Sequence, residues 1–525
     1  MTTLTAPTQA KSTESANGQK PSVIVSTSPA TGRYLGEVPI TPLESVPTVM
    51  AKARAAQSGW FRAGLRHRID VLRRIKNALH LNMDLIISTQ IAEQGKPPMD
   101  ALQEFWAAIE TFAFYIRRSQ ETLAPRRVMA TLLPHRIYWI ERRPYGVVLT
   151  ITPWNYPLLL STAPIAAALA AGNTVIWKPS EYATQIAALF TKIMRDAGVP
   201  EDVFQTVYGA GDLGAALIKA KPNKISFTGS VPTGRKIAAA AGELLIPCQL
   251  ELGAKDAAIV LDDADLDRSA RGIVWGGLQN AGQACLSIEQ VYVARSVMEP
   301  FIKIMTEVIE REIKVGPGEA PGVTMGAIST QLQMDVIEGQ LADAVAKGAQ
   351  VIAGGKRLEG GNGRLFPPTL LTKVNPDMKI MRDETFGPIL VIIPFDRDDE
   401  AVSMSNASPY GLTASVWTRN RARGLAMIDQ LEVGHAAVND HIMSASIPYL
   451  PWGGTKDSGY GASRGKEGLI EMTRAQSFSI ERFAPLHTEV LWYPYTPQKY
   501  NLLRRALRAL YAPTIAEKIR LLIGR

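Results

Sequence analysis

Cysteine is scarce in this chain, which has only Cys248 and Cys285 among its 525 residues. Two cysteines that lie 37 positions apart cannot form a disulfide framework, and they lack the close pairing from which zinc sites are usually built. We therefore expect no structural disulfides and no metal site. Such low cysteine usage fits a reducing compartment, so we expect a cytoplasmic protein.

Long apolar runs are also absent. No uncharged apolar stretch reaches the roughly 18 residues that a membrane-spanning helix needs, and the Thr-, Ser- and Ala-rich block 1–22 lacks the apolar segment of a secretory signal. We expect this block to be a disordered tail. The chain as a whole, with 46% hydrophobic and 20% charged residues, has a globular composition, and its length predicts two or three domains.

The net charge of +8 is spread along the chain, with a local excess of basic residues only near the C-terminus. Dispersed basic charge is typical of a solvated surface rather than of a face that binds nucleic acid. We therefore expect no nucleic-acid partner.

Short apolar runs alternate with amphipathic segments in two parts of the chain. The first part contains "YGVVLTITP", "NTVIWKPS", "VFQTVYG", "KISFTGS" and "CQLELG"; the second, from about 288 to 440, contains "IEQVYVA", "QVIAGG", "PILVIIPF", "ASVWT" and "HAAVND". Buried strands separated by helices are typical of parallel α/β sheets with right-handed crossovers. The sequence thus predicts an α/β fold with two lobes and a cleft between them.

Two glycine-rich segments are candidates for phosphate binding. Gly209, Gly211 and Gly214 in "GAGDLG" match the spacing of the dinucleotide fingerprint and follow an expected strand. In "FTGS", Gly229 and Ser230 precede an expected helix, whose first amides suit a phosphate. Neither segment has the Lys-Ser/Thr ending of a P-loop, so ATP is not the expected ligand.

Cys285 lies in "NAGQACLS" among small or flexible neighbours, whereas a cysteine kept for packing usually has larger apolar ones. Four other fragments accompany it in the chain: "TPWNYP", "WKPSE", "LELGAK" and "DETFGPIL". In this order and at these spacings, the five fragments resemble the NAD(P)-dependent aldehyde dehydrogenase superfamily, over about residues 23–485. The resemblance implies a Rossmann-type cofactor domain, an α/β catalytic domain and a small β element for oligomerisation.

The resemblance implies a catalytic set of Cys285, Asn155 and Glu251. A thiolate attacks the aldehyde carbonyl, the Asn155 side-chain amide and the Cys285 N–H stabilise the oxyanion, and a buried Glu251 activates the water that hydrolyses the thioester. Each residue also has a structural interpretation: a small core side chain, a turn former and a strand-end carboxylate. We interpret Cys248 as structural. Ala254 stands where the family usually has glycine, which puts the geometry after Glu251 in question.

By the same resemblance, we expect NAD as the cofactor and NADP as a weaker alternative. Lys178 and Glu181 are then at the adenine ribose, where the Glu181 carboxylate accepts bonds from both hydroxyls and repels a 2′-phosphate. "FTGS" faces the pyrophosphate, and "GAGDLG" is largely a structural turn. The expected cofactor residues are Thr152, Pro153, Trp154, Lys178, Ser180, Glu181, Gly229, Ser230, Gly253, Glu384 and Phe386.

The expected domain boundaries follow from the same fragments. They are 23–125 with 145–253 for the NAD-binding domain, 254–474 for the catalytic domain, 126–144 with 475–490 for the oligomerisation strands, and 491–525 for a basic amphipathic tail. The strands are expected to build a homodimer by sheet extension, and pairing of dimers into a homotetramer stays open.

The tail has a second pattern, in residues 500–525. Leu503, Leu507 and Leu510 recur at helical spacing, with arginines between them. Such a basic amphipathic helix suits peripheral contact with a membrane. The other interpretation is packing against a neighbouring subunit or across the mouth of the substrate tunnel.

The substrate is not settled by these patterns. Family members that oxidise succinate semialdehyde tend to have an arginine where Ala163 stands. The expected tunnel residues are instead apolar or aromatic, which favours an aromatic, terpenoid or long-chain aldehyde. They are Tyr156, Leu160, Leu286 and Trp452, with Phe112 and Tyr115 on a nearby helix. Against this, the whole chain most resembles a subgroup often labelled succinate-semialdehyde dehydrogenase, and Arg117 and Arg118 are nearby cations that suit a carboxylate.

Three functions compete. The favoured one is NAD-dependent oxidation of an aldehyde to the free acid. A CoA-acylating aldehyde dehydrogenase is disfavoured by Glu251, because thioester transfer to CoA needs no water-activating base. A non-catalytic scaffold is disfavoured by the intact Cys285, Asn155 and Glu251.

Overall fold

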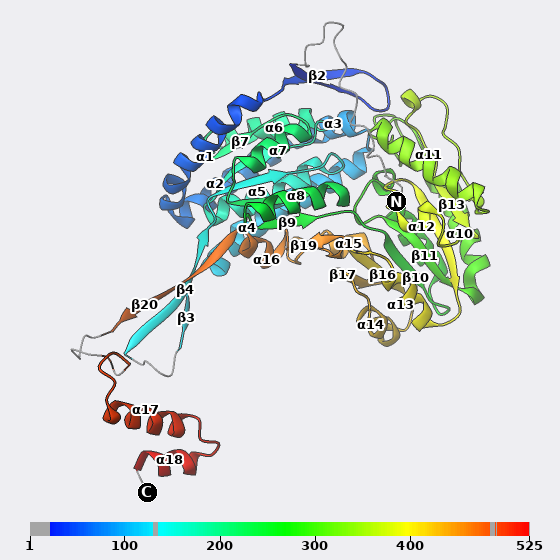
Figure 1. Ribbon diagram of the computed structural model, residues 1–525. Coiled ribbons are helices and arrows are strands. Elements are labelled where there is room, and N and C mark those ends of the chain that lie inside the picture. Colours follow the sequence, from blue (N-terminus) through cyan, green and yellow to red (C-terminus); the bar gives the residue numbers. More distant parts are fainter. Residues whose placement is uncertain (1–21, 130–134, 483–488, 490, 524–525) are drawn as a thin grey trace. The chain divides into compact units, whose positions relative to one another are not determined.

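The computed structural model describes residues 22–129, 135–482, 489 and 491–523 (Figure 1). The expected disordered tail, 1–22, lies outside the described residues apart from Ser22. The chain divides into two compact units. One comprises Met1–Ala124 and Arg142–Ala475, and the other comprises Pro125–Glu141 and Gln476–Arg525. The first unit holds two large sheets, which confirms the α/β fold class.

The first large sheet has six strands in the order β19-β9-β8-β5-β6-β7. Five of them are parallel, and β19 runs antiparallel to β9. The strands are β5 Val147–Ile151, β6 Thr174–Lys178, β7 Phe204–Thr206, β8 Lys224–Thr228, β9 Cys248–Glu251 and β19 Gly459–Tyr460. Apart from β19, these are the apolar runs that the sequence predicted as strands.

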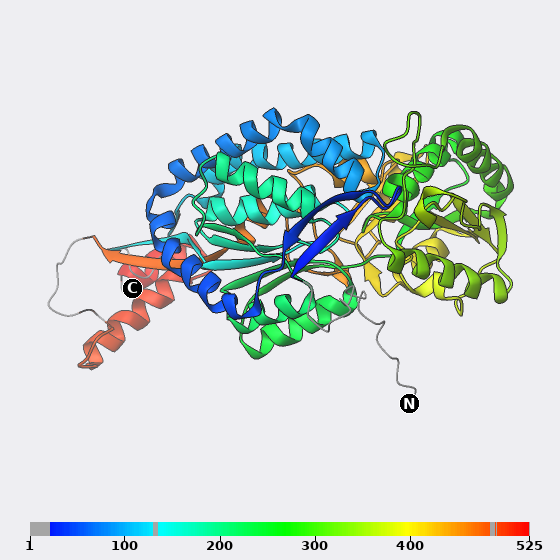
Figure 2. The ribbon, with the colours of Figure 1, turned by 90° about the horizontal axis from the view of Figure 1, so that it is seen from above.

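Helices cover both faces of this sheet (Figure 2). Because side chains alternate along a strand, Val148 and Trp177 enter one core with α2 to α6, whereas Val147 and Leu149 enter another with α1, α7 and α8. The helices are α1 Val46–Arg62, α2 Gly64–Leu81, α3 Met83–Gln94, α4 Pro98–Leu123, α5 Pro157–Ala171, α6 Thr184–Asp196, α7 Gly211–Lys219 and α8 Val231–Glu243.

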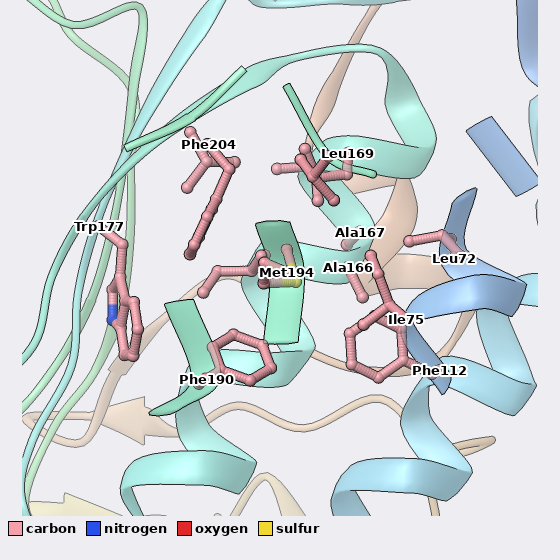
Figure 3. Close-up of a cluster of buried hydrophobic side chains, with 14 of the residues drawn as sticks. Leu72, Ile75, Phe112, Ala166, Ala167, Leu169, Trp177, Phe190, Met194 and Phe204 are labelled. Atoms are coloured by element: carbon pink, nitrogen blue, oxygen red, sulfur yellow. The ribbon is translucent and has the colours of Figure 1, made fainter. Parts of the chain in front are cut away.

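Aromatic rings fill the centre of the first core (Figure 3). Trp177 of β6 meets Phe190 of α6 edge-on, with ring centroids 5.6 Å apart, and Phe204 of β7 lies 6.0 Å from Trp177. Edge-to-face contacts of this kind add to the free energy gained by burial. They fix the end of β6, where the expected cofactor residue Lys178 follows Trp177.

The carboxyl ends of the parallel strands lie together at one edge of the first sheet. Ile151 pairs with both Lys178 and Phe227, and Thr228 pairs with Glu251. Ligands of doubly wound sheets bind outside this edge. Four of the motif-bearing segments, which follow β5, β6, β8 and β9, therefore meet there.

The second large sheet has the order β12-β13-β14-β11-β10-β16-β17, in which only β12 is antiparallel to its neighbour. Its strands are β10 Asp256–Val260, β11 Ile288–Ala294, β12 Gln350–Ala353, β13 Thr369–Thr372, β14 Ile389–Phe395, β16 Thr413–Trp417 and β17 His435–Val438. Associated helices are α9 Leu266–Leu278, α10 Met298–Glu312, α11 Gln331–Ala346, α12 Lys379–Arg382, α13 Asp398–Asn406, α14 Arg421–Ile428 and α15 Ile442–Ala445. Helix α16 Gly465–Glu471 packs instead on α4 and α5. Short two-stranded pairs are formed by β1 Val23–Thr27 with β2 Tyr34–Pro39, and by β15 Tyr410–Gly411 with β18 Thr455–Lys456.

A third, small sheet has the order β20-β4-β3. Its strands are β3 Arg126–Val128, β4 Arg136–Pro144 and β20 Thr473–Glu481. The first two form the expected hairpin, and Trp139 stacks on Phe478 with ring centroids 5.2 Å apart. The role of these strands in oligomerisation stays a prediction.

One group of side chains in the second unit has potential metal ligands close together. The ligand atoms of His135, Glu481 and Glu489 lie within 4.8 Å of one another. Arg136 Nη2 donates to Glu489 at 2.9 Å and His135 lies 3.0 Å from the same carboxylate. Because Glu489 is already paired with a cation, we interpret the group as an ion-pair cluster.

Two helices end the second unit, α17 Pro497–Leu510 and α18 Ile515–Ile523. The sequence predicted one amphipathic helix over 500–525. That prediction was wrong, because the segment forms two helices. Pro513 has no N–H and restricts the residue before it, so the helix breaks there and restarts. Within the ranges that the structure describes, no helix is long and apolar enough to cross a membrane.

Candidate active site

Cys285 lies on a strained loop between α9 and β11. Asn280, Ala281 and Gly282 have φ angles of 51°, 56° and 72°, a left-handed conformation that costs energy for the two residues other than glycine. A Cβ atom at Gly282 would lie 2.2 Å from the carbonyl oxygen of Gly387, so only glycine fits. The loop before Cys285 is thus pressed against the backbone that precedes β14.

Asn155, in the turn between β5 and α5, is buried beside this loop. Its Nδ2 donates to the carbonyl of Gln283 at 3.1 Å, and Asn280 Nδ2 donates to the Asn155 carbonyl at 3.2 Å. These two bonds fix the Asn155 amide next to the residues that precede Cys285. The second proton of the amide remains suited to an oxyanion.

A buried ion pair between Lys96, which precedes α4, and Glu104 of α4 supports the Asn155 turn and the start of α5. Lys96 Nζ lies 2.6 Å from Glu104 and donates to the Asn155 carbonyl at 2.8 Å. The same Glu104 accepts bonds from the first amides of α5, those of Leu158 at 2.8 Å and Leu159 at 3.2 Å. The carboxylate therefore caps the helix that follows Asn155. This pair was not predicted from the sequence, because neither residue belongs to a recognised motif.

Glu251, the last residue of β9, is buried and lines the same cavity as Cys285. Burial raises the pKa of its carboxyl to about 7, while a hydrogen bond to Ser463, the charge of Arg464 and a hydrogen bond to Trp452 limit the rise. Near neutral pH the carboxyl is therefore divided between its protonated and ionised forms. Such a group suits general base catalysis at neutral pH.

Arg464 is a buried cation in this cavity that the sequence analysis missed. Its guanidinium lies over the ring of Trp452, 4.7 Å from the centroid, and burial lowers its pKa while Glu251 and Cys285 raise it. Burial also raises the pKa of the Cys285 thiol, nearby carboxylates raise it further, and Arg464 lowers it. Arg464 is thus the cation that favours the ionised forms of both groups.

A second buried network lies behind the residue that follows Cys285. His441 Nε2 lies 3.0 Å from the Leu286 carbonyl and 3.0 Å from Thr413 Oγ1, which also bonds Asp256. Burial lowers the pKa of His441 to about 4, so the ring is neutral at pH 7 and donates one N–H. This network holds the backbone just after the thiol.

The cavity has a volume of about 450 Å³ and its lining is mainly apolar. The expected tunnel residues Tyr156, Leu160, Leu286 and Trp452 line it, as does Ala163. The prediction that Phe112 and Tyr115 also line the cavity was wrong.

Phe112 and Tyr115 are fully buried in the core between α4 and its neighbours and do not line the cavity. They occupy the face of α4 that packs on other helices, which the spacing alone did not reveal. The guanidinium groups of Arg117 and Arg118 lie 5.9 Å from the ring centroid of Tyr449 on the exposed side. They are not among the residues that line the cavity.

The surroundings of Lys178 indicate whether a nucleotide fits at the carboxyl edge of the first sheet. Its ammonium group is buried, and in the described part of the chain its one hydrogen-bond acceptor is the Pro179 carbonyl at 3.3 Å. Burial lowers its pKa, whereas Glu181 and Asp212 raise it. A buried ammonium with donors to spare fits ribose hydroxyls or a phosphate. Glu181, partly exposed nearby, adds an acceptor.

The other expected cofactor residues of this sheet lie around the same edge. The Thr152 hydroxyl accepts a bond from Trp177 Nε1 at 2.9 Å, so its side chain joins β5 to β6. The Ser180 hydroxyl accepts from the Tyr182 amide at 3.3 Å in a turn. Gly229 N donates to the Glu251 carbonyl at 2.9 Å, and Ser230 is the residue before α8. Pro153, the remaining expected residue after β5 besides Trp154, directly follows Thr152.

Glu384 and Phe386 precede β14 of the second sheet and contact residues at this edge of the first sheet. Phe386 meets Trp154 edge-on, with ring centroids 5.6 Å apart, and Ala254 N donates to Glu384 at 3.0 Å. A Cβ at Gly253 would lie 2.3 Å from the Glu384 carboxylate, so that carboxylate covers the backbone after β9. Burial raises the pKa of Glu384 to about 8.

Buried Glu289 holds the segment between those two residues. Its carboxylate accepts bonds from the amides of Thr385 and Phe386 at 2.9 and 2.8 Å, and it pairs with buried Lys255. Glu289 and Lys255 were not predicted from the sequence. Their contacts show why Phe386 can keep a φ of 50°.

A half-buried thiol and a buried carboxyl thus line one cavity, and a buried side-chain amide is fixed to the loop that precedes the thiol. The profile of the aldehyde dehydrogenase family matches residues 16–478. The chain belongs to this family, and it is an oxidoreductase.

Relatives and solved structures agree with this assignment. The chain is 36% identical over 491 residues to 4,4'-diapolycopene aldehyde oxidase of a Methylomonas species, covering 93% of this chain and 91% of that protein. It is 35% identical over 454 residues to a Mycolicibacterium smegmatis protein provisionally named succinate-semialdehyde dehydrogenase (NADP+), covering 86% and 87%. A crystal structure of an NAD-dependent aldehyde dehydrogenase from Sinorhizobium meliloti has a TM-score of 0.85 and 30% identity, covering 91% and 95%.

The charge of Arg464 predicts a measurable change in thiol reactivity. In a Cys248→Ser background, Arg464→Gln should raise the pKa of Cys285, and one pKa unit corresponds to about tenfold less thiolate below the pKa. We expect the rate of alkylation by iodoacetamide, followed against pH, to shift to higher pH. Arg464→Lys should retain most of the wild-type profile. An unchanged profile in Arg464→Gln would show that the guanidinium does not act on the thiol.

Proposed function

We propose that this protein is an NAD-dependent aldehyde dehydrogenase that converts an apolar aldehyde to the free carboxylic acid. The observation that carries the proposal is that Cys285 and Glu251 line one mainly apolar cavity, beside the fixed amide of Asn155. NAD+ bound at the sheet edge supplies a two-electron acceptor for hydride. The remaining chemistry belongs to side chains of this chain.

Cys285 acts first, as a thiolate that adds to the aldehyde carbon. The carbonyl π electrons move to oxygen, and the Asn155 Nδ2–H and the Cys285 N–H stabilise the resulting oxyanion. When the oxyanion re-forms its C=O bond, hydride is expelled from carbon and a thioester to Cys285 remains. The apolar lining keeps stray water away from these intermediates.

Glu251 acts second, in hydrolysis. It takes a proton from water, whose oxygen adds to the thioester carbon, and the Cys285 thiolate is then expelled with the acid as product. The pKa of about 7 allows Glu251 both to accept that proton and to release it to solvent. Since transfer to CoA needs no such base, Glu251 favours hydrolysis over CoA acylation.

The Glu181 carboxylate supports NAD over NADP. It lies close enough to Lys178 to raise the lysine pKa, so both groups act at the end of β6. A carboxylate accepts hydrogen bonds from a ribose diol but repels a 2′-phosphate. The mycobacterial relative is named for NADP+, and for this chain we propose that Lys178 tolerates NADP as the weaker cofactor.

The cavity supports an aromatic, terpenoid or long-chain aldehyde. Ala163 lines it where a carboxylate-binding arginine would stand, and Trp452 and Leu286 add apolar surface. The Methylomonas relative is named for 4,4'-diapolycopene aldehyde. Succinate semialdehyde is the second candidate, favoured by the buried Arg464 and by the name of the mycobacterial relative. Arg464 already faces Glu251, which disfavours its use for a second carboxylate.

The three-stranded sheet supports a homodimer. Its order leaves β20 and β3 as edges within the sheet, and an edge strand presents unpaired N–H and C=O groups to another chain. A second copy that pairs along such an edge would extend the sheet. The mass of the protein in solution would distinguish a dimer from a tetramer.

The proposed function is tested by NADH formation with the purified enzyme. We expect decanal and benzaldehyde to give higher kcat/KM than succinate semialdehyde, and Cys285→Ala to abolish turnover while NAD binding persists. The matched control is Cys248→Ser, which should keep most activity because Cys248 is not among the residues that line the cavity of Cys285 and Glu251. Substantial oxidation by Cys285→Ala would contradict the assignment, and a preference for succinate semialdehyde would replace only the substrate.

Glu251→Gln tests the hydrolytic step. The amide cannot deprotonate water, so hydride transfer should continue while thioester hydrolysis slows. Stopped-flow absorbance should show one burst of NADH per active site followed by turnover slowed at least about 100-fold. Loss of the burst would mean that Glu251 also takes the thiol proton. Added CoA should not restore turnover, and rescue by CoA would support the acylating alternative.

Glu181→Ser tests cofactor choice. Two charge-assisted hydrogen bonds to a ribose diol suffice for roughly 1.4–2.8 kcal/mol of preference, or about ten- to a hundredfold in kcat/KM. The serine variant should use NAD less well and admit NADP, so the ratio should shrink. The measurement is kcat/KM for both cofactors in both proteins. A wild type that prefers NADP, or a ratio that does not move, would place specificity elsewhere.

A further inference from the structure

The C-terminal helices carry an uncovered apolar face. On α17, Tyr500, Leu503, Leu507 and Leu510 are spaced three, four and three residues apart, so they share one side of the helix. Tyr500 is 66% and Leu507 41% exposed. Leu503 and Leu510 are half-buried, and the fully buried residues in the described part of the tail are small, Ala509 and Ala512. The helices therefore leave this face partly open.

Exposed aromatic residues also lie before and after α17. Trp492, Tyr493 and Tyr495 precede the helix and Tyr511 ends it, all of them exposed. Tryptophan and tyrosine have an apolar ring with a polar edge, which suits the boundary between lipid and water. On α18, Ile515 is 77% exposed. The segment 491–519 therefore offers large apolar groups on both helices.

Basic residues flank the apolar face. Residues 491–523 contain six lysines and arginines and one carboxylate, Glu517. Arg504, Arg505 and Arg508 lie on another side of α17 from the leucines, are exposed, and pair with no carboxylate in the described part of the chain. The tail thus presents a positive surface that is open to an anionic partner.

We infer that residues 491–523 form a docking surface for an anionic lipid bilayer. An amphipathic helix with a basic flank binds a membrane interface by inserting its apolar side among acyl chains while its cations meet lipid phosphates and carboxylates. A second copy of the tail is a poorer occupant, since a two-fold contact between identical tails would bring like charges together. This inference does not depend on the proposed enzymatic function.

The test uses the full-length protein and sedimentation with vesicles. We expect binding to phosphatidylcholine vesicles that contain about 30% phosphatidylserine, weak binding to pure phosphatidylcholine, and release by high salt. Arg504→Glu with Arg505→Glu and Arg508→Glu should reduce the bound fraction about tenfold or more. The matched control, Lys52→Glu with Lys236→Glu and Lys356→Glu, changes the net charge equally on exposed residues of the first unit and should bind normally.

A second variant separates lipid binding from subunit contact. Trp492→Ser with Tyr500→Ser and Leu507→Ser should weaken vesicle binding while the mass from light scattering stays that of wild type. NADH formation with a water-soluble aldehyde should be unchanged in every variant, so failure here is distinct from failure of the enzymatic proposal. Absence of wild-type binding to anionic vesicles, equal loss in the lysine control, or a fall in mass would overturn the inference.

Discussion

The buried ion pair between Lys96 and Glu104 is the contact on which the site depends. It reaches the Asn155 carbonyl and the first amides of α5 at once, and α4 also binds the Asn280 amide through Asp100 at 2.9 Å. Taking two charges from water is costly, and the pair is tolerable only because hydrogen bonds satisfy both partners. Removing one partner of such a pair typically costs about 3–5 kcal/mol. These contacts thus position the Asn155 turn, which follows a strand of the first sheet, and the Asn280 loop, which precedes a strand of the second sheet.

Strain is held at the point where the two sheets meet. The left-handed residues before Cys285 and the positive φ of Phe386 lie on opposite sides of one contact, between Gly282 and the backbone of Gly387. Neither conformation would persist on an isolated loop. Glu289, through the amides of Thr385 and Phe386, and Gln283, through its side-chain bond to the Asn280 carbonyl at 2.9 Å, supply the bonds that keep them. The close approach explains why glycine is required in the cysteine loop.

The sequence predicted the features that local chemistry determines. The apolar runs that form β5, β6, β8 and β9 identify strands because buried parallel strands have no polar face, and the order of the motifs identified the family. Arg464, Lys96 and Glu104 were missed because their role comes from contacts between distant segments, which no spacing encodes. Phe112 and Tyr115 were misplaced for a related reason. Helix α4 packs on several helices, so its aromatic residues have more than one apolar direction available, and the sequence does not choose between them.

Several acidic groups and one cation, Arg464, determine the electrostatics around the Cys285 thiol. Glu251, Asp256 and Glu384 all raise the pKa of the Cys285 thiol, and Arg464 is the cation that opposes them. Glu251 itself has a pKa of about 7 and Glu384 of about 8, so near neutral pH part of this acid population is protonated. A thiolate and an ionised Glu251 in the same apolar cavity repel each other, which makes their ionisations coupled rather than independent. In the reaction we propose, the negative charge that Arg464 balances is carried by sulfur when the aldehyde is attacked and by the Glu251 carboxylate when the thioester is hydrolysed. The two halves of the reaction can share one cation because they need that charge at different times.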